Sequence, residues 1–125
     1  MIVGVGIDLV ATARIERLHR RFGERLARRL LATAEWDDYR CAADGVRLLA
    51  KRFAAKEAAA KALGVGIAQG VRFGDLWVVH DTAGAPGLRW GGAARSRAEH
   101  LGAVRAHLSL SDERDQVVAC VILEG

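Results

Sequence analysis

Residues 52–66 read RFAAKEAAAKALGVG, and this stretch decides the fold because it marks the longest helix of the chain. Alanine favours a helix more than any other residue, and Gly64 is typical of the position just after a helix C-terminus. The predicted helix covers Arg47–Leu63. Its charges form two neighbouring stripes, with Phe53 at the head of the first: Glu57 and Lys61 on one, and Arg52 and Lys56 on the other.

Outward from this helix, the remaining segments predict an α+β fold. Apolar residues alternate as in strands over Ile2–Val10 and Val104–Ser111, and helical spacing follows the first strand. Further predicted elements are the strands Val71–His80, Leu88–Trp90 and the central, buried Gln116–Leu123, and a helix over Ala93–Leu101. This order indicates an antiparallel-rich sheet with the long helix packed on it, and 125 residues fit a single domain, 1–125.

The charge distribution predicts an anionic partner. The chain carries a net charge of +4, and the segment 14–29 alone holds seven arginines against two glutamates. Nucleic acid, an acidic protein and a phosphorylated small molecule all fit such a surface. The arginines that matter most for the argument below are Arg14, Arg17, Arg21 and Arg25.

The two cysteines, Cys41 and Cys120, form no CxxC pair, so we expect neither a zinc site nor a disulfide framework. Cys120 lies in the apolar run VVACVIL, which predicts a small buried side chain. The first residues lack the basic segment of a signal peptide, and no apolar run approaches the ~20 residues of a membrane helix. We therefore expect a cytoplasmic protein without a membrane partner.

Glu57 and Asp8 are the candidate metal ligands. A plain surface salt bridge between Glu57 and Lys61 would be worth only ~0.3–0.5 kcal/mol. Phe53 on the same stripe argues instead for a partly buried carboxylate among cations, an arrangement that can hold magnesium and the phosphates bound to it. Asp8 ends the first strand and shares a face with two glycines, which leave space for a ligand or another backbone; it could also be a capping or turn residue.

Two further features carry weaker signals. His107 lies between Arg105 and Ser109 on its strand, and a lone histidine is often structural. The turn Gly64-Val65-Gly66 is too short for a P-loop, although its backbone N–H groups could meet a phosphate.

Three motifs together resemble one family. GIDLV at 6–10, RFAAKEAAAKALGVG at 52–66 and HLSLSDE at 107–113 have the order and spacing of the holo-(acyl-carrier-protein) synthases, the small 4′-phosphopantetheinyl transferases. The similarity covers essentially the whole chain, and the middle motif is the most specific.

The resemblance implies an enzyme with a 4′-phosphopantetheinyl transferase-like fold. Such enzymes use Mg²⁺ to transfer 4′-phosphopantetheine from coenzyme A to a serine hydroxyl of an apo acyl carrier protein in fatty-acid or polyketide synthesis, releasing adenosine 3′,5′-bisphosphate. They are typically homotrimers with each active site between two subunits. Carried over by motif, the metal ligands are Asp8 and Glu57, the catalytic groups are Glu57, Lys61 and Asp8, and the coenzyme A-binding residues are Arg52, Lys56, Lys61, Gly64, His107 and Ser111. An acidic carrier would dock on Arg14, Arg17, Arg21 and Arg25.

The chain departs from the family pattern at two positions. Val65 stands where threonine is common, and Asp112 stands where a histidine commonly follows the serine aligned with Ser111. Asp112 would bring a negative charge near coenzyme A if it pointed inward, and a shifted carrier preference is a hypothesis that these departures motivate. The alternatives are a catalytically silent scaffold and a basic nucleic-acid-binding domain, which explains the arginines but not Asp8, Glu57 and Lys61.

Overall fold

The computed structural model describes residues 1–67 and 69–125, and it confirms the α+β class. In chain order the elements are β1 (Ile2–Ala11), α1 (Thr12–Phe22), α2 (Glu24–Leu30), the 3₁₀ turn η1 (Thr33–Glu35), α3 (Trp36–Cys41), α4 (Gly45–Leu63), the 3₁₀ turn η2 (Phe73–Asp75), β2 (Leu76–His80), β3 (Pro86–Trp90), α5 (Gly92–Leu101), β4 (Arg105–Asp112) and β5 (Gln116–Glu124). The long helix begins two residues before the expected start, where the side chain of Asp44 accepts a hydrogen bond from the N–H of Arg47.

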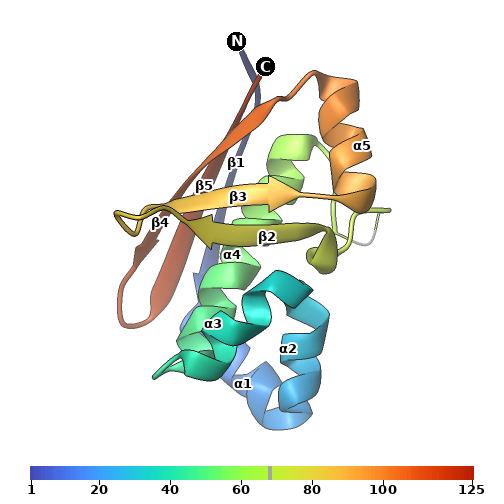
Figure 1. Ribbon diagram of the computed structural model, residues 1–125. Coiled ribbons are helices and arrows are strands. Elements are labelled where there is room, and N and C mark those ends of the chain that lie inside the picture. Colours follow the sequence, from blue (N-terminus) through green and yellow to red (C-terminus); the bar gives the residue numbers. More distant parts are fainter. Residues whose placement is uncertain (68) are drawn as a thin grey trace.

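The main sheet has the strand order β1-β5-β4, and both pairs are antiparallel. Helix α4 packs against one face of this sheet, while the β2–β3 hairpin crosses beside it (Figure 1). Helices α1, α2 and α3 gather at one end of α4, and the chain termini lie together at the other end (Figure 1). The sequence correctly placed Gln116–Leu123 at the centre of the sheet.

Close contact between β1 and α4 explains the two glycines that precede Asp8. A Cβ atom on Gly4 would overlap the carbonyl oxygen of Ala62, and one on Gly6 would overlap that of Ala58. The space beside Asp8 is therefore filled by the backbone of α4, which was one of the two occupants that the sequence left open. This contact fixes the distance between the strand that carries Asp8 and the helix that carries Glu57.

The opposite face of the sheet, here called the outer face, is apolar yet exposed. Side chains of β1 on this face are about 60% accessible: Val5 60%, Ile7 61% and Leu9 61%. Across the strand pairs they neighbour half-buried Val118, Cys120 and Ile122 of β5. A single chain thus leaves the apolar side of its first strand uncovered.

Three local predictions need correction. Asp8 lies within β1, not at its end, because the strand continues to Ala11. The segment predicted as one strand over Val71–His80 forms η2 first, and only Leu76–His80 is a strand. Cys120 is half-buried on the outer face, since it is the alternate residues of β5 that face α4.

Candidate active site

The candidate metal ligands meet where β1 crosses α4. Lys61 on α4 donates from Nζ to Oδ1 of Asp8 at 3.1 Å and to the carbonyl oxygen of Ile7 at 3.0 Å. The other carboxylate oxygen of Asp8, Oδ2, is buried and has no hydrogen-bond partner among the described residues. Buried polar atoms are nearly always hydrogen-bonded, so this oxygen is available to a ligand.

Glu57 faces the same place one helical turn before Lys61. Within the described residues it makes neither an ion pair nor a hydrogen bond, so the alternative of a Glu57–Lys61 salt bridge is wrong. The pKa of Glu57 is raised, first because burial disfavours its charge and then because the charge of Asp8 repels it; Lys61 and Arg14 oppose both effects. A carboxylate whose charge is disfavoured, beside a second carboxylate with an oxygen that has no partner among the described residues, fits a divalent cation.

The described residues form no larger ligand set around Asp8 and Glu57. Across residues 1–67 and 69–125, no group of three or more His, Cys, Asp or Glu side chains is placed to hold a metal ion. A site built on Asp8 and Glu57 would thus leave most coordination positions to other oxygens, which suits magnesium because it keeps waters and takes substrate phosphates as ligands.

A pocket of about 460 Å³ opens beside Glu57 between α4 and the arginine-rich helices. Arg14 and Arg25 line it together with apolar side chains of α1, α2, α4 and η2: Leu18, Phe22, Leu26, Leu30, Phe53 and Phe73. The guanidinium of Arg14 lies over the ring of Phe53, 5.2 Å from its centroid, and those of Arg21 and Arg25 lie over Phe22 at 5.1 and 5.3 Å. Of the predicted docking arginines, Arg14 and Arg25 line the pocket that contains Glu57, whereas Arg17 and Arg21 are exposed and do not line it. Arg29, which was not among the predicted docking arginines, lines it as well.

The predicted role of Lys56 is wrong. This lysine is fully buried, and its three N–H donors are used by Glu35 Oε1 at 2.6 Å, Leu30 O at 2.6 Å and Phe73 O at 3.0 Å. Burial lowers the pKa of Lys56, and the charge of Glu35 opposes that effect. No donor is left for a coenzyme A phosphate.

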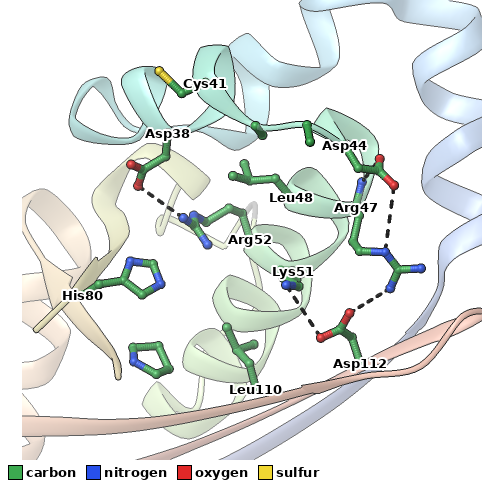
Figure 2. A pocket seen from close by; sticks show the side chains of 13 residues that line it. Asp38, Cys41, Asp44, Arg47, Leu48, Lys51, Arg52, His80, Leu110 and Asp112 are labelled. Carbon is green, nitrogen blue, oxygen red and sulfur yellow. Dashed lines mark hydrogen bonds and ion pairs between the residues drawn. The ribbon is translucent and has the colours of Figure 1, made fainter. Parts of the chain in front are cut away.

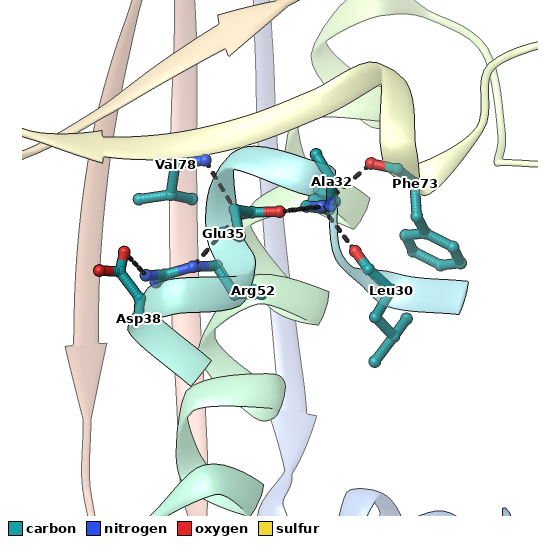
Figure 3. Close-up of polar contacts among 8 residues, drawn as sticks. Leu30, Ala32, Glu35, Asp38, Arg52, Phe73 and Val78 are labelled. Atoms are coloured by element: carbon teal, nitrogen blue, oxygen red, sulfur yellow. Dashed lines mark hydrogen bonds and ion pairs between the residues drawn. The ribbon is translucent and has the colours of Figure 1, made fainter. Parts of the chain in front are cut away.

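Arg52, one turn earlier, joins the same buried cluster. Its Nε lies 3.2 Å from Glu35 Oε2, but without hydrogen-bond alignment, and its Nη2 donates to Asp38 Oδ2 at 3.4 Å (Figure 3). Its side chain is only 4% exposed, yet it lines a pocket of about 590 Å³ together with His80 and Asp112 (Figure 2). A contact of Arg52 with a phosphate stays a prediction.

Asp112 is neutralised within that pocket. It accepts from Arg47 Nη1 at 2.8 Å, and its other oxygen lies 3.6 Å from Lys51 Nζ (Figure 2). Arg47 also donates to the carbonyls of Glu113 and Arg114. The negative charge that Asp112 introduces at this position is therefore balanced by Arg47 and Lys51. The contacts of Arg47 also join the β4–β5 turn to the first turns of α4.

The turn after α4 offers no free N–H group at its glycines. The N–H of Gly64, at φ = 74°, and that of Val65 close the helix by donating to Lys61 O and Ala60 O. The N–H of Gly66 donates to Gln69 Oε1 at 2.9 Å. The expected backbone phosphate contact at Gly64 is thus not supported in this conformation.

His107 and Ser111 do not join Asp8 and Glu57 within one chain. Asp8 on β1 is paired with Ala119 of β5, and both residues face α4. On the other side of β5, His107 and Ser111 of β4 are paired with Ile122 and Val118, which lie on the outer face. His107 Nε2 lies 3.1 Å from Glu124 Oε1. That hydrogen bond, followed by the charge of Arg105, lowers the pKa of Glu124.

Sequence reasoning missed Glu35 and the clamp between Arg47 and Asp112. Glu35 lies in the run TAEW, where one acid among mixed residues gives no periodic signal of burial. The clamp joins residues 65 positions apart, and charged side chains at such a separation are brought together only by the fold.

Known proteins resemble this chain over almost its whole length. A family model described as the 4′-phosphopantetheinyl transferase superfamily matches residues 4–121. The holo-[acyl-carrier-protein] synthase of Halorhodospira halophila is 54% identical over 98% of each chain. The crystal structure of the corresponding synthase from Neisseria meningitidis has a TM-score of 0.91 and 44% identity over 100% of both chains. That of the Bacillus anthracis synthase, in complex with coenzyme A (3′,5′-ADP), has a TM-score of 0.81 and 35% identity over 100% of this chain and 98% of the other.

Proposed function

This chain belongs to the 4′-phosphopantetheinyl transferase superfamily, and from that premise we propose that it transfers 4′-phosphopantetheine from coenzyme A to a serine hydroxyl of an apo acyl carrier protein. The observation that carries the assignment to particular residues is the buried, unpartnered Oδ2 of Asp8, placed beside Glu57 and Lys61 at the crossing of β1 and α4.

Asp8 and Glu57 would hold a magnesium ion in this proposal. A cation there would neutralise the pyrophosphate of coenzyme A and relieve the repulsion between the two carboxylates. Lys61 suits the leaving phosphate because two of its three donors are used by Asp8 and Ile7 and its side chain is 55% exposed. The third donor can therefore reach a phosphate oxygen without breaking the contact to Asp8.

Glu57 is the proposed base. Its raised pKa means that it binds a proton more readily than an ordinary carboxylate. It takes the proton from the carrier serine as the serine oxygen bonds to the phosphorus that bears pantetheine. The bond from that phosphorus to the bridging oxygen breaks, and adenosine 3′,5′-bisphosphate leaves with the electron pair. Asp8 is the second candidate for the base.

The pocket lined by Arg14 and Arg25 is the proposed meeting point with the carrier. Carrier proteins are acidic, and a positive surface speeds and orients docking of an acidic partner. Because Glu57 lines the same pocket, a serine carried into it would arrive next to the base. Arg17 and Arg21 would extend the positive surface around the pocket mouth.

A homotrimer is part of this proposal. His107 and Ser111, expected at coenzyme A, lie on the outer face and away from Asp8 of their own chain. A second copy packed on the apolar outer face could supply them, which would also cover Val5, Ile7 and Leu9. We place the enzyme in the cytoplasm, in keeping with two free cysteines; no described helix is long and apolar enough to cross a bilayer.

The test is a transfer assay with intact-mass analysis of the carrier. Apo acyl carrier protein, coenzyme A and magnesium are incubated with the enzyme, and the carrier is expected to gain one phosphopantetheine group. Glu57→Ala should abolish this transfer. The nucleic-acid-binding alternative would be favoured by two results together: the wild type transfers phosphopantetheine to none of several carriers, and Glu57→Ala binds nucleic acid as well as the wild type does.

A further inference from the structure

A charged cluster lies inside the molecule, behind the pocket that contains Glu57. Glu35 and Lys56 are both fully buried, and Glu35 accepts hydrogen bonds from three donors: Lys56 Nζ and the N–H of Ala32 at Oε1, and the N–H of Val78 at Oε2 (Figure 3). Arg52 Nε lies 3.2 Å from Oε2 as an ion pair without a hydrogen bond. A buried ion pair is often no more stabilising than apolar side chains of the same size. Its position therefore needs an explanation other than stability.

The cluster holds two backbone segments that form the pocket wall. Lys56 donates to the carbonyl oxygens of Leu30, at the end of α2, and Phe73, in η2. Both of these residues line the pocket of about 460 Å³, as does Glu57. One ammonium group thus ties the wall of the pocket to the helix that carries the base.

Polar contacts hold the two ends of helix α4, from Arg47 to Asp112 near its start and from Lys61 to Asp8 near its end. The middle of the helix depends on other contacts. The face that it buries is built largely from alanine, whose short side chains interlock little with their neighbours: Ala50, Ala54, Ala55, Ala58, Ala59 and Ala62. Near its C-terminal end, Gly4 and Gly6 let the backbone of β1 lie directly against it. Around residues 52–56, the charged anchors to Glu35 supply the corresponding constraint.

Glu57 follows Lys56, and Phe53 follows Arg52. Consecutive side chains of a helix project about 100° apart, so anchoring residues 52 and 56 inward directs residues 53 and 57 to the adjacent face. That face is the one opposite α1, where Arg14 stacks on Phe53. A small rotation of α4 would move Glu57 away from both the pocket and Asp8.

We propose that Glu35 is a positioning residue for phosphopantetheine transfer: through Lys56 and Arg52 it sets the rotation of α4 and the wall of the pocket, and so holds Glu57 in register with Asp8 and the incoming serine. The proposal rests on the role given to Glu57 above. Glu35 is fully buried, so in this proposal it acts through Lys56 and Arg52 and not by contact with substrate or metal.

The experiment separates positioning from stability with two variants. In Glu35→Gln the amide NH₂ replaces one of the two acceptor oxygens with a donor. Depending on the orientation of the amide, this donor faces either Val78 and Arg52 or Ala32 and Lys56. The charge of Lys56 is also left without its counter-charge. Adding Lys56→Met removes that charge with a side chain of similar length. We expect the single variant to have the lower melting temperature, and the double variant to recover most of the loss.

Activity should not follow this recovery. We expect the double variant to keep a kcat at least about ten-fold below wild type, with KM for coenzyme A and for carrier changed less than about two-fold, because misplaced groups mainly slow the chemical step. Leu123→Ala is the matched control: it removes buried volume from β5, outside the cluster, and should lower the melting temperature while kcat stays near wild type at temperatures where the protein is folded.

Recovery of kcat together with the melting temperature in the double variant would overturn the positioning role. An equal loss of kcat in Leu123→Ala would do the same, because activity would then follow stability alone. Wild-type enzyme assayed in parallel distinguishes failure of the proposed function from failure of the role of Glu35. If the wild type transfers phosphopantetheine and the double variant does so with the same kcat, only the role of Glu35 is excluded.

Discussion

Lys61 on α4 bridges to Asp8 on β1 at 3.1 Å and occupies only one of its two carboxylate oxygens. The second oxygen is buried and has no hydrogen-bond partner among the described residues, and the charge of Asp8 is close enough to Glu57 to help raise its pKa. The strand and the helix can approach closely enough for this arrangement because Gly4 and Gly6 have no side chains. The close packing of backbone thus brings together residues about 50 positions apart in sequence.

Asp8→Asn should abolish transfer without unfolding the protein. The amide keeps the size of the side chain but cannot supply the anionic oxygen that a divalent cation requires, and it loses the ion pair with Lys61. We expect kcat to fall by about 100-fold or more, measured by single-turnover transfer to apo carrier. Asp37→Asn, at a side chain 98% exposed, is the control and should be fully active. Near-normal activity of Asp8→Asn would remove Asp8 from the metal site.

Glu57→Gln should stabilise the metal-free protein at neutral pH. Because the pKa of Glu57 is raised in the folded state, its contribution to stability is fully present below its ordinary value of about 4.5 and is lost as pH rises through the folded value. Glutamine avoids that loss, so the variant should melt about 1–2 °C higher at pH 7, a small effect because the carboxylate is only half-buried.

The pH dependence of the melting temperature tests whether the pKa of Glu57 is raised. Melting temperatures of both proteins are measured in a chelator from pH 4 to pH 8, where the difference should be smallest at acidic pH and grow as pH rises. Added magnesium should raise the melting temperature of the wild type and leave Glu57→Gln nearly unchanged. A variant that is less stable than wild type at neutral pH would contradict the shift assigned to Glu57.

Arg14→Gln and Arg25→Gln should weaken carrier docking more than coenzyme A binding. Both residues line the pocket beside Glu57, and screened surface charge falls off within about 10 Å at 0.1 M salt. We expect KM for carrier to rise several-fold while KM for coenzyme A stays constant, and added salt to affect the wild type more than the variants. Arg95→Gln, on α5, is the control. An unchanged KM for carrier would exclude this docking surface.

Ile7→Lys should disrupt the assembly and not the fold. Ile7 is 61% exposed on the outer face of one chain, so a lysine there costs the isolated chain little but would place charge in a subunit contact. Light scattering should report a monomer, with native circular dichroism and little transfer activity. Val104→Lys, at another exposed apolar residue, should leave the assembly intact. An active variant of unchanged mass would contradict the assembly through this face.

The sequence predicted the α+β class, the long helix and the central strand because those depend on periodicity and on the helix-ending glycine. It also indicated that Asp8, Glu57 and Lys61 act together, and that prediction relied on a family resemblance and not on spacing. It could not predict that Lys56 turns inward to Glu35 while Glu57, the next residue, faces the pocket. On a helix made mostly of alanine, the sequence does not distinguish a buried charged stripe from an exposed one.

The most direct test of the central claim is magnesium-dependent modification of an apo acyl carrier protein by the wild-type enzyme, followed by intact mass. The account predicts that carrier, coenzyme A and magnesium together yield carrier bearing one phosphopantetheine group, that a chelator stops the reaction, and that excess magnesium restores it. Transfer at the same rate in the chelator, or no modified carrier with magnesium present, would contradict a metal site formed by Asp8 and Glu57.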